Sequence, residues 1–526
     1  METAKQEKRA KKSLFYRFIH GVEVVGNKLP HPFYLFSILI VVAIILSVIF
    51  AGTSVTYEKA SSSGAASEMV TVTVQNLLNK ETITYVTQNM YKIYYSFSPM
   101  MMMGLLMLSI GLAEQVGLFG AVIKRTIAGA KPSFVFAIVS FIAINANTAS
   151  NAGILGCTAV SAAVFAAMGY NPWLGILLAY AAGNAGMSAN VFVGNLDVLL
   201  SGINESVCGS LGIDTSTVHV LQNWYFMAAC AIILTVVFTF VTTKFVRPLL
   251  GEAKDLSLVQ ADNSQRELSA IERKGLRNAG IAAVIYIVAW VVLCIPKNSF
   301  FRADDGSIVP NSPLLKSALT ILFLFFLVTA AVYGRTTGKI QMWSDLPKLL
   351  TSGIDSMVTF MVIALPASLF IYLFNESNLP TALGAAGAAW IKSAGISGFG
   401  LLVVVVFFST FLNLFMTSGS SKWMILAPIL IPMFYAIGFS PALTTVAYRI
   451  GDSSTNAIAP ISSDVALIVG LLVKYNTDKT KKPGMGTVFA GCMPYAIATM
   501  IAELLILAVW WVLKLPLGPG VEMFIH

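Results

Sequence analysis

Charged residues are scarce in this chain. Of its 526 residues, Asp, Glu, Lys and Arg account for 11% and hydrophobic residues for 56%, and the mean hydropathy is +0.77. Soluble globular domains carry about 25% charged residues, so a water-soluble fold is excluded. With about 20 apolar residues needed for one crossing, the hydrophobic stretches suffice for roughly ten membrane spans.

Cysteine is rare as well, and the five cysteines are scattered through the chain. Their spacing provides neither a disulfide framework nor a zinc site. The sequence also shows no nucleophile–base pair. Gly-rich fragments such as 384–387 do not predict a phosphate-binding loop, because no strand precedes them. We therefore expect no enzyme activity, no resident cofactor and no ATP-driven step.

The net charge of +9 could indicate a nucleic-acid partner. Lys and Arg residues lie instead at the ends of the hydrophobic segments, so the excess reports membrane topology and no nucleic-acid partner is expected. Residues 1–32 are expected on the cytoplasmic side. The first apolar run, 33–52, is too long and too far from the start for a cleaved signal peptide, and is predicted to be a retained helix in contact with lipid.

Seven apolar stretches have the length of a membrane helix. They are 33–52, 97–115, 224–247, 279–296, 316–334, 356–374 and 492–514. Two further regions, 132–200 and 398–470, are apolar on average but contain the polar clusters 145–151 and 417–422. Such clusters cannot face lipid, because every unpaired backbone N–H or C=O in hydrocarbon costs several kcal/mol.

We therefore predict that both regions fold inward. The ranges 132–168 and 398–438 are predicted to be re-entrant hairpins with the polar clusters at their tips, and 172–200 and 441–470 to be broken spanning helices. The expected fold is an all-α polytopic membrane protein with nine transmembrane helices and two re-entrant hairpins.

The distribution of Lys and Arg supports this topology in a bacterial inner membrane. With the N-terminus in the cytoplasm, the segments predicted inside are rich in Lys and Arg, whereas the predicted outside segment 201–222 has none. Counting either hairpin as a full crossing would reverse this asymmetry. The cytoplasmic segment 248–278 is the predicted linker between a first half, 33–247, and a second half, 279–526.

The two halves contain matching motifs in the same order. The motifs are Gly169-x-x-Pro172 with Gly438-x-x-Pro441, Ala179-Tyr180-x-x-Gly183-Asn184 with Ala447-Tyr448-x-x-Gly451-Asp452, and Asp197-Val198 with Asp464-Val465. Chance identity is the alternative, although Pro, Tyr and Asp matches are rarer than Ala or Gly matches. In the predicted topology the two hairpins enter from opposite sides, and inverted repeats with broken helices are typical of secondary transporters.

Ionisable residues inside the predicted spans are functional candidates, because burying them in a membrane is costly. They are Asp197, Lys422, Arg449, Asp452, Asp464 and Glu503. Arg449 and Asp452 are three residues apart and share a helix face. One interpretation is a structural ion pair that neutralises itself; the other is that Arg449 attracts an anionic substrate while Asp452 takes a proton or binds Na⁺. Glu503 is assigned no role.

The second predicted tip offers polar groups for a ligand. Ser418 and Ser420 provide hydroxyls, and amide N–H groups at a helix N-terminus favour anions. Trp423 is either an interfacial anchor or a platform on which an aromatic substrate stacks. Lys422 is given less weight, because its long side chain can extend toward the interface.

Two asparagines occupy nearly equivalent places in the two halves, Asn145 in the first and Asn413 in the second. A satisfied core amide is the commoner explanation for one Asn, but a repeat-related pair suggests oxygen ligands for a cation. Asn413, Asp452 and Asn145 are therefore candidate ligands of a coupling Na⁺. Asn184, which matches Asp452, would be the neutral half of the site.

Six stretches resemble the aminobenzoyl-glutamate transporter (AbgT) family. They are GNKLPHPF at 26–33, DVLLSG at 197–202, NWYFM at 223–227, SGSSKWMILAP at 418–428, YRIGDSS at 448–454 and LPLGPG at 515–520. They run through nearly the whole chain in order and are highly specific as a set. The resemblance implies a homodimer that moves p-aminobenzoyl-glutamate or related folate fragments inward, or exports sulfonamides, using a proton or sodium gradient.

The resemblance also assigns roles to residues. The family's pathway residues fall on Asp197, Ser420, Trp423, Pro441, Arg449, Asp452 and Pro460, and a family sodium site involves Asn413 and Asp452. The chain departs from the family at the first tip, where many members have an acidic residue in place of Asn151 and a proline in place of Ala159. Asn151 is kept as a substrate-binding candidate together with Ser418.

Other functions are compatible with parts of this pattern. The nearest alternative is a sodium-coupled dicarboxylate carrier of related architecture, which would not need Trp423 at the tip. A membrane-embedded enzyme would turn over its substrate without a membrane, and a channel would carry currents unaffected by Asp452→Asn. The exact substrate, the direction of transport and the coupling ion are left open by the sequence.

Overall fold

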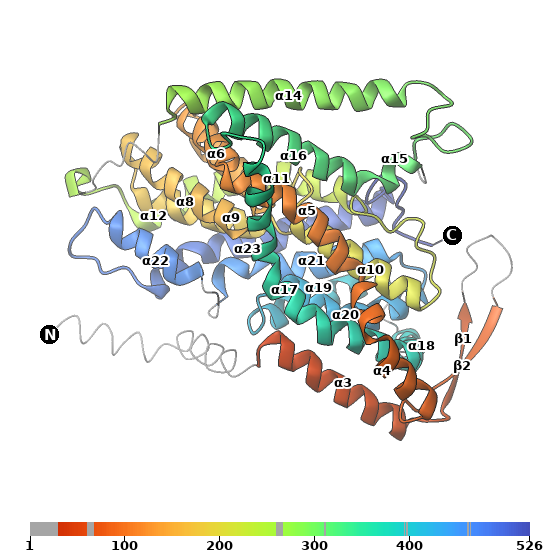
Figure 1. The fold of residues 1–526 in the computed structure, drawn as a ribbon. Coiled ribbons are helices and arrows are strands. Elements are labelled where there is room, and N and C mark those ends of the chain that lie inside the picture. The colour runs from red at the N-terminus through yellow and green to blue at the C-terminus, as the bar shows by residue number, and fades with distance from the viewer. Residues whose placement is uncertain are drawn as a thin grey trace.

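Helices dominate this chain (Figure 1). The structure, a computed structural model, describes residues 30–59, 68–258, 267–309, 312–393, 395, 398–459, 462 and 464–525. The helices are α3 (Pro32–Ile49), α4 (Lys80–Tyr95), α5 (Ser98–Gln115), α6 (Leu118–Ala128), α7 (Val135–Ala146), α8 (Ser150–Ala167), α9 (Pro172–Ala185), α10 (Asn195–Ser210), α11 (Trp224–Val241), α12 (Arg247–Leu250), α14 (Ala270–Cys294), α15 (Pro313–Lys316), α16 (Ala318–Thr337), α17 (Asp345–Glu376), α18 (Leu379–Ser393), α19 (Phe399–Asn413), α20 (Gly419–Tyr435), α21 (Pro441–Ser454), α22 (Asp464–Lys474) and α23 (Met485–Leu513). The predicted cytoplasmic segment 1–32 lies almost wholly outside the described residues.

Seven helical segments in the described ranges are long and apolar enough to cross a membrane. They are Pro32–Ile49, Lys80–Gln115, Trp224–Leu250, Ala270–Cys294, Ala318–Thr337, Met357–Glu376 and Met485–Leu513. Each overlaps one of the seven apolar stretches of the sequence, so those helix predictions are confirmed. The other two crossings and the re-entrant geometry stay predictions.

The helix after the linker begins at a capping box. The Ser269 hydroxyl accepts from the Glu272 N–H at 3.2 Å, and the Glu272 carboxylate accepts from the Ser269 N–H at 2.7 Å. These bonds satisfy amides that the first helical turn leaves unpaired. As a result α14 starts at Ala270, inside the range 248–278 that the sequence predicts as linker.

The linker is fastened to the loop between α22 and α23. Lys254 Nζ lies 2.9 Å from Asp478 Oδ2, and the Asp255 N–H donates to the Thr477 carbonyl at 3.2 Å. Hydrogen bonds from the Thr480 hydroxyl and from Lys254 lower the pKa of Asp478 to about 2, so its carboxylate is charged at neutral pH. Two segments far apart in sequence are thereby joined at one end of the molecule, beside α12 and α22 in Figure 1.

The region between α3 and α5 contains a small sheet as well as a helix. β1 (Ser54–Lys59) and β2 (Glu68–Thr73) pair antiparallel, with Ser54 opposite Thr73. α4 begins after Asn79, whose side-chain oxygen accepts from the Thr82 N–H at 2.8 Å. An Asn at this position satisfies an amide that the helix start leaves unpaired.

The repeated Gly-x-x-Pro motif is the same turn in both halves. Gly169 (φ 82°) follows α8 and Gly438 (φ 91°) follows α20, both in the left-handed conformation that favours glycine. In each turn the N–H of the next residue bonds back to the carbonyl five positions earlier at 2.9 Å, as in a Schellman cap. Pro172 and Pro441 then begin the next helix, where a missing N–H costs nothing.

α9 and α21, which follow these turns, form the buried centre of the molecule. All their residues are buried. The matched glycines let each helix approach an earlier one closely: a Cβ at Gly183 would lie 2.7 Å from the Ile154 side chain of α8. A Cβ at Gly451 would overlap the Val406 carbonyl of α19. The shared glycine of the repeat therefore has a packing reason in both halves.

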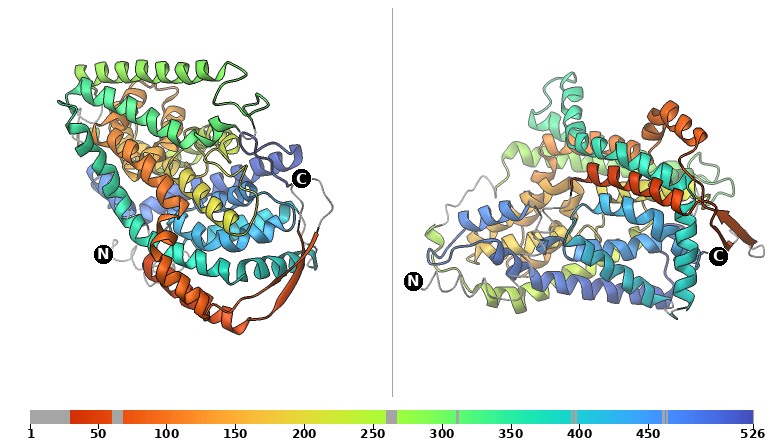
Figure 2. Two further views of the ribbon diagram at one scale, coloured as in Figure 1. Left: turned by 45° about the vertical axis from the view of Figure 1, so that its right-hand side comes forward. Right: turned by 90° about the horizontal axis from the view of Figure 1, so that it is seen from below.

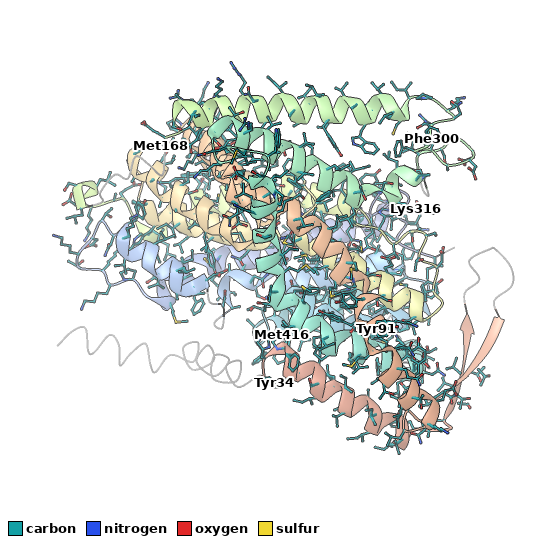
Figure 3. The ribbon with its side chains drawn as sticks, viewed as in Figure 1. Tyr34, Tyr91, Met168, Phe300, Lys316 and Met416 are labelled. Carbon is teal, nitrogen blue, oxygen red and sulfur yellow. The ribbon has the colours of Figure 1, made fainter. Side chains whose placement is uncertain are left out.

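The outer surface is apolar where helices lie at the edge. α14 runs along one edge and α3 along the opposite edge in Figure 1, and α14, in green, keeps its edge position in the left view of Figure 2. Val284 and Ile285 of α14 are 61% and 64% exposed, which suits contact with lipid. Phe300, labelled beside the loop after α14 in Figure 3, is 95% exposed.

The segment 515–525 packs back on both halves. The Leu517 carbonyl accepts from the Tyr225 N–H at the start of α11 at 3.0 Å. The Met523 carbonyl accepts from the N–H of Ser440, the residue that caps α21, at 2.9 Å. The segment therefore holds the beginnings of two helices that belong to different halves.

Candidate functional site

Two helix interruptions contribute residues to a common cavity. Residues 186–194 separate α9 from α10, and residues 455–463 separate α21 from α22. The cavity has a volume of about 550 Å³. Its polar lining comes from both halves: Asn147, Asn184, Asn190, Asn195, Asp197, Thr417, Ser418, Ser420, Arg449, Asn456, Ser462 and Asp464. Secondary transporters bind their substrates at such meeting points of broken helices.

Asp197 and Arg449 form an ion pair that joins the halves. Arg449 Nη1 lies 2.7 Å from Asp197 Oδ1, and the two side chains are 4% and 5% exposed. Arg449 Nη2 also donates to the Met187 carbonyl at 2.7 Å. The second carboxylate oxygen of Asp197 accepts from Asn190 Nδ2 at 2.9 Å and from the Gly194 N–H at 2.6 Å, at the positive N-terminus of α10. Both predicted substrate-binding residues thus line the cavity together.

Several buried polar atoms of the cavity lining have no hydrogen-bond partner among the described residues. They are Asn147 Nδ2, Asn190 Oδ1, Asn195 Oδ1 and Arg449 Nε. A buried unpaired donor or acceptor costs about 1–3 kcal/mol. A ligand that carries a carboxylate and amide-like groups can satisfy these atoms, and the guanidinium favours an anion.

Asp452 is paired with Lys422 rather than with Arg449. Lys422 Nζ contacts Asp452 Oδ1, and the two side chains are 2% and 1% exposed. The interpretation of Arg449 and Asp452 as a self-neutralising pair is therefore wrong: their spacing puts them on one helix face, but each finds its partner on another element. Lys422 does not extend to the interface, because it supplies the counter-charge that a buried carboxylate requires.

Asn413 belongs to the same cluster. Its Oδ1 accepts from Lys422 Nζ, and its Nδ2 donates to Thr455 Oγ1 at 3.1 Å and to Asn456 Oδ1 at 2.7 Å. Two of the three candidate sodium ligands, Asn413 and Asp452, are thus brought together. The position between their oxygens is held by an ammonium group of the chain itself.

Asn145, the third candidate sodium ligand, joins other groups. Its Oδ1 accepts from the Val191 N–H at 2.9 Å, and its Nδ2 donates to the Phe141 carbonyl at 2.9 Å. The side chain therefore fastens the end of α7 to the first helix interruption. Asn413 and Asp452 are instead joined through Lys422, and the three-residue sodium site stays a prediction.

Trp423 is buried behind the tip and does not line the cavity. Its side chain is 0% exposed, its ring stacks on Tyr448 with 4.6 Å between centroids, and Nε1 donates to Asn204 Oδ1 at 2.7 Å. The interpretation as an interfacial anchor is wrong, because the indole reaches no surface. Stacking of a substrate on Trp423 stays a prediction, for another conformation of the tip.

Trp423→Phe is expected to destabilise the protein by about 1–3 kcal/mol, because Asn204 Oδ1 loses its donor in a buried place. Thermal unfolding of the purified protein in detergent measures this loss as a lower midpoint. Trp343→Phe, at a tryptophan that is 65% exposed, is the matched control and should leave the midpoint unchanged. Equal midpoints for the two variants would show that the indole N–H has no structural role.

The remaining candidates lie around the second tip and the first. Ser418 and Ser420 line the cavity at the N-terminus of α20. Pro441 is the buried first residue of α21 and is not among the lining residues. Asn151 lies in α8, but its side chain is outside the described part of the structure, as is the whole of Pro460.

Several functional candidates were missed from the sequence. Asn190 and Asn195 line the cavity, and the polar spacing of 184–197 in an otherwise apolar region could have indicated them. Ser188 donates to Glu503 Oε1 at 2.5 Å and is hydrogen-bonded to Ser453. Glu503, which the sequence left without a role, is therefore connected with both broken helices.

The chain is similar over most of its length to proteins of known function. Residues 17–525 match the AbgT transporter family. The chain is 34% identical over 500 residues, covering 95% of it and 96% of the relative, to the p-aminobenzoyl-glutamate transport protein of Escherichia coli strain K12.

Two solved structures share the fold. The YdaH transporter of Alcanivorax borkumensis, described as having an unusual topology, matches with a TM-score of 0.83 and 27% identity over 93% of this chain and 100% of that one. MtrF of Neisseria gonorrhoeae, described among antimetabolite efflux pumps, matches with a TM-score of 0.87 and 30% identity over 96% of this chain and 100% of that one. These relatives are transporters rather than enzymes, and this chain therefore belongs to the AbgT family of membrane transporters.

Proposed function

We propose that this chain is a secondary active transporter of the bacterial inner membrane that moves p-aminobenzoyl-glutamate, related aromatic carboxylates or sulfonamides, driven by a proton or sodium gradient. The observation that carries the proposal is the Arg449 guanidinium, which lines the cavity with its Nε unpaired. A carboxylate is the best-matched partner for such a group. The similarity to a p-aminobenzoyl-glutamate transport protein and to an antimetabolite efflux pump supports this choice of substrates.

The neutral amides of the cavity suit the rest of such a substrate. Asn190 and Asn195 present unpaired oxygens that can accept from an aromatic amine or an amide N–H, and Asn147 presents an unpaired donor. Sulfonamides carry related groups, an aromatic amine and a sulfonyl group whose oxygens accept hydrogen bonds beside an acidic N–H. A volume of about 550 Å³ also lies within the range of small-molecule sites.

The ion pair between the halves gives a route from binding to movement. A substrate carboxylate that bonds to Arg449 competes with Asp197, which belongs to the first half. A bound substrate would then weaken the Asp197–Arg449 ion pair, which joins the two halves. The substrate would bind more tightly to a conformation in which this ion pair is already broken. Such differential affinity is what a ligand needs in order to shift a conformational equilibrium.

The arrangement in the membrane is part of the proposal. We propose nine transmembrane helices, re-entrant hairpins at 132–168 and 398–438 that enter from opposite sides, a cytoplasmic N-terminus and a homodimer. The equivalent Schellman turns after α8 and α20 support a duplicated architecture. The excess of Lys and Arg in the predicted inside segments supports the orientation.

Purified protein in proteoliposomes is expected to move radiolabelled p-aminobenzoyl-glutamate when a proton or sodium gradient is imposed. Each gradient is applied separately and in both directions, so that import and export are both measured. Protein-free vesicles and vesicles treated with an ionophore are the controls. If neither gradient stimulates flux of this compound or of sulfonamides in either direction, the proposal is wrong.

A dicarboxylate carrier is the second candidate, and one observation favours it. Among the described residues the cavity has no aromatic lining, since Trp423 is turned toward Tyr448. A small dicarboxylate needs no aromatic platform. In the same vesicles, strong inhibition of p-aminobenzoyl-glutamate flux by succinate, together with no inhibition by p-aminobenzoate, would favour this candidate over the first.

A further inference from the structure

The buried ammonium of Lys422 occupies a place that the sequence predicts for a sodium ion. It contacts Asp452 Oδ1 and Asn413 Oδ1, which are the oxygens expected to bind Na⁺. The side chain is 2% exposed, so these contacts are shielded from bulk solvent. Lys422 lies in the first turn of α20, and its contacts tie the second tip to α21.

These residues do not fit Na⁺ while Lys422 is in place. The Asn413 amide has one acceptor atom, and that atom is bonded to the ammonium; its donor faces Thr455 and Asn456. Na⁺ needs several oxygens directed at one point, and the Asn413 and Asp452 oxygens that would meet there are directed at the ammonium instead.

Charge leads to the same conclusion. Lys422 and Asp452 neutralise each other, so the cluster has no net charge to attract a second cation. A Na⁺ bound at the same oxygens would lie a few Å from the ammonium in a buried place. Repulsion between unit charges at that distance lowers cation affinity by on the order of 100-fold or more.

We propose that Lys422 is a tethered cation that replaces sodium in this cluster, so that Asn413 and Asp452 do not bind Na⁺ in this chain. The tie between the second tip and α21 is therefore independent of the sodium concentration. The inference rests on the proposed function only in taking the cluster as part of a transport pathway. It predicts that a sodium gradient exerts no drive through these residues.

Lys422→Met is expected to create a sodium site, because it vacates the position and leaves Asp452 without a counter-charge. The midpoint of thermal unfolding is measured in detergent, without substrate, as NaCl replaces choline chloride at constant ionic strength. Wild-type protein should show the same midpoint throughout. In choline chloride the variant should have a lower midpoint than the wild type. NaCl should raise the midpoint of the variant, and the half-maximal NaCl concentration should be on the order of 100-fold lower than any concentration at which NaCl raises the midpoint of the wild type.

Three variants make the test specific. Lys422→Arg keeps the tethered charge and should stay indifferent to sodium. Lys422→Met combined with Asp452→Asn removes both charges, so it should fold but lose the sodium effect. Lys316→Met, at an exposed lysine of α15 labelled in Figure 3, is the matched control for loss of a lysine and should behave as wild type.

Two results would overturn the inference. One is sodium-specific stabilisation of the wild-type protein that Asp452→Asn abolishes, which can be measured even if no Lys422 variant folds. The other is a folded Lys422→Met variant with equal midpoints in both salts. Neither readout involves transport, so a failure of the proposed substrate leaves this test intact.

Discussion

Replacing Arg449 with methionine is expected to weaken binding of a carboxylate substrate by about 10- to 100-fold. A hydrogen bond to a charged partner contributes about 1.5–3 kcal/mol, and 1.4 kcal/mol corresponds to tenfold in affinity. The change also leaves the Asp197 carboxylate buried without its counter-charge, which is expected to cost about 3–5 kcal/mol of stability. Both losses follow from one side chain because Arg449 serves the cavity and the contact between the halves.

Companion variants separate the two effects. Arg449→Met with Asp197→Leu removes both charges and should recover most of the stability but none of the binding. Arg449→Lys keeps the charge but loses the fork of donors, so intermediate binding is expected. Arg247→Met is the matched control, because Arg247 and its partner Glu252 are 39% and 65% exposed and such pairs contribute at most about 1 kcal/mol.

Equilibrium binding of radiolabelled p-aminobenzoyl-glutamate, thermal unfolding in detergent and uptake by proteoliposomes measure these effects. Arg449→Met with wild-type affinity would remove this residue from the substrate site. Wild-type stability of the same variant would instead show that Asp197 finds another partner or takes up a proton.

Gly451→Ala is expected to give little folded protein. The added Cβ would overlap the Val406 carbonyl and lie 2.6 Å from Ser409 Cβ, so two central helices would have to move apart. Overpacking of a core costs about 1–3 kcal/mol and sometimes more. We expect a loss of stability at the high end of this range, because the added Cβ meets the helix backbone at Val406, which cannot rotate away. A shift of α21 would also move Asp452 away from its partner Lys422 on α20.

Gly470→Ala is the matched control for this change. Gly470 lies in α22 with no atom within 4 Å of the added carbon, and Ala is a better helix former than Gly by about 1 kcal/mol. The control should be neutral or slightly stabilised. Size-exclusion profiles and unfolding midpoints compare the two, and a monodisperse, wild-type-like Gly451→Ala protein would contradict the packing of α21 on α19.

Local sequence patterns predict much of the helical scaffold. Runs of about twenty apolar residues set seven helices, since their length is fixed by the thickness of hydrocarbon. The Gly-x-x-Pro repeat predicts its turn for a local reason as well, because a left-handed glycine and a proline restrict the backbone themselves. Such features need no knowledge of distant contacts.

The partners of the charged residues could not be predicted in the same way. Arg449 and Asp452 are neighbours on one helix, and the spacing favours a local pair. In the structure Arg449 pairs with Asp197 and Asp452 pairs with Lys422, because tertiary packing brings these buried charges from other elements into contact. Burial of Trp423 against Tyr448 likewise depends on the placement of α20 over α21, which no periodicity in the sequence records.

The segment 515–525 has a consequence for the order in which the protein is made. It bonds to the backbone at Tyr225 and Ser440, yet the ribosome produces it after both and after the last long helix. Until Leu517 and Met523 arrive, those two amides must be satisfied by water or by the insertion machinery. Assembly of the centre around α21 is therefore completed after translation of the helices themselves, and a nascent chain halted before residue 515 would be held in an earlier, proteolysis-sensitive form.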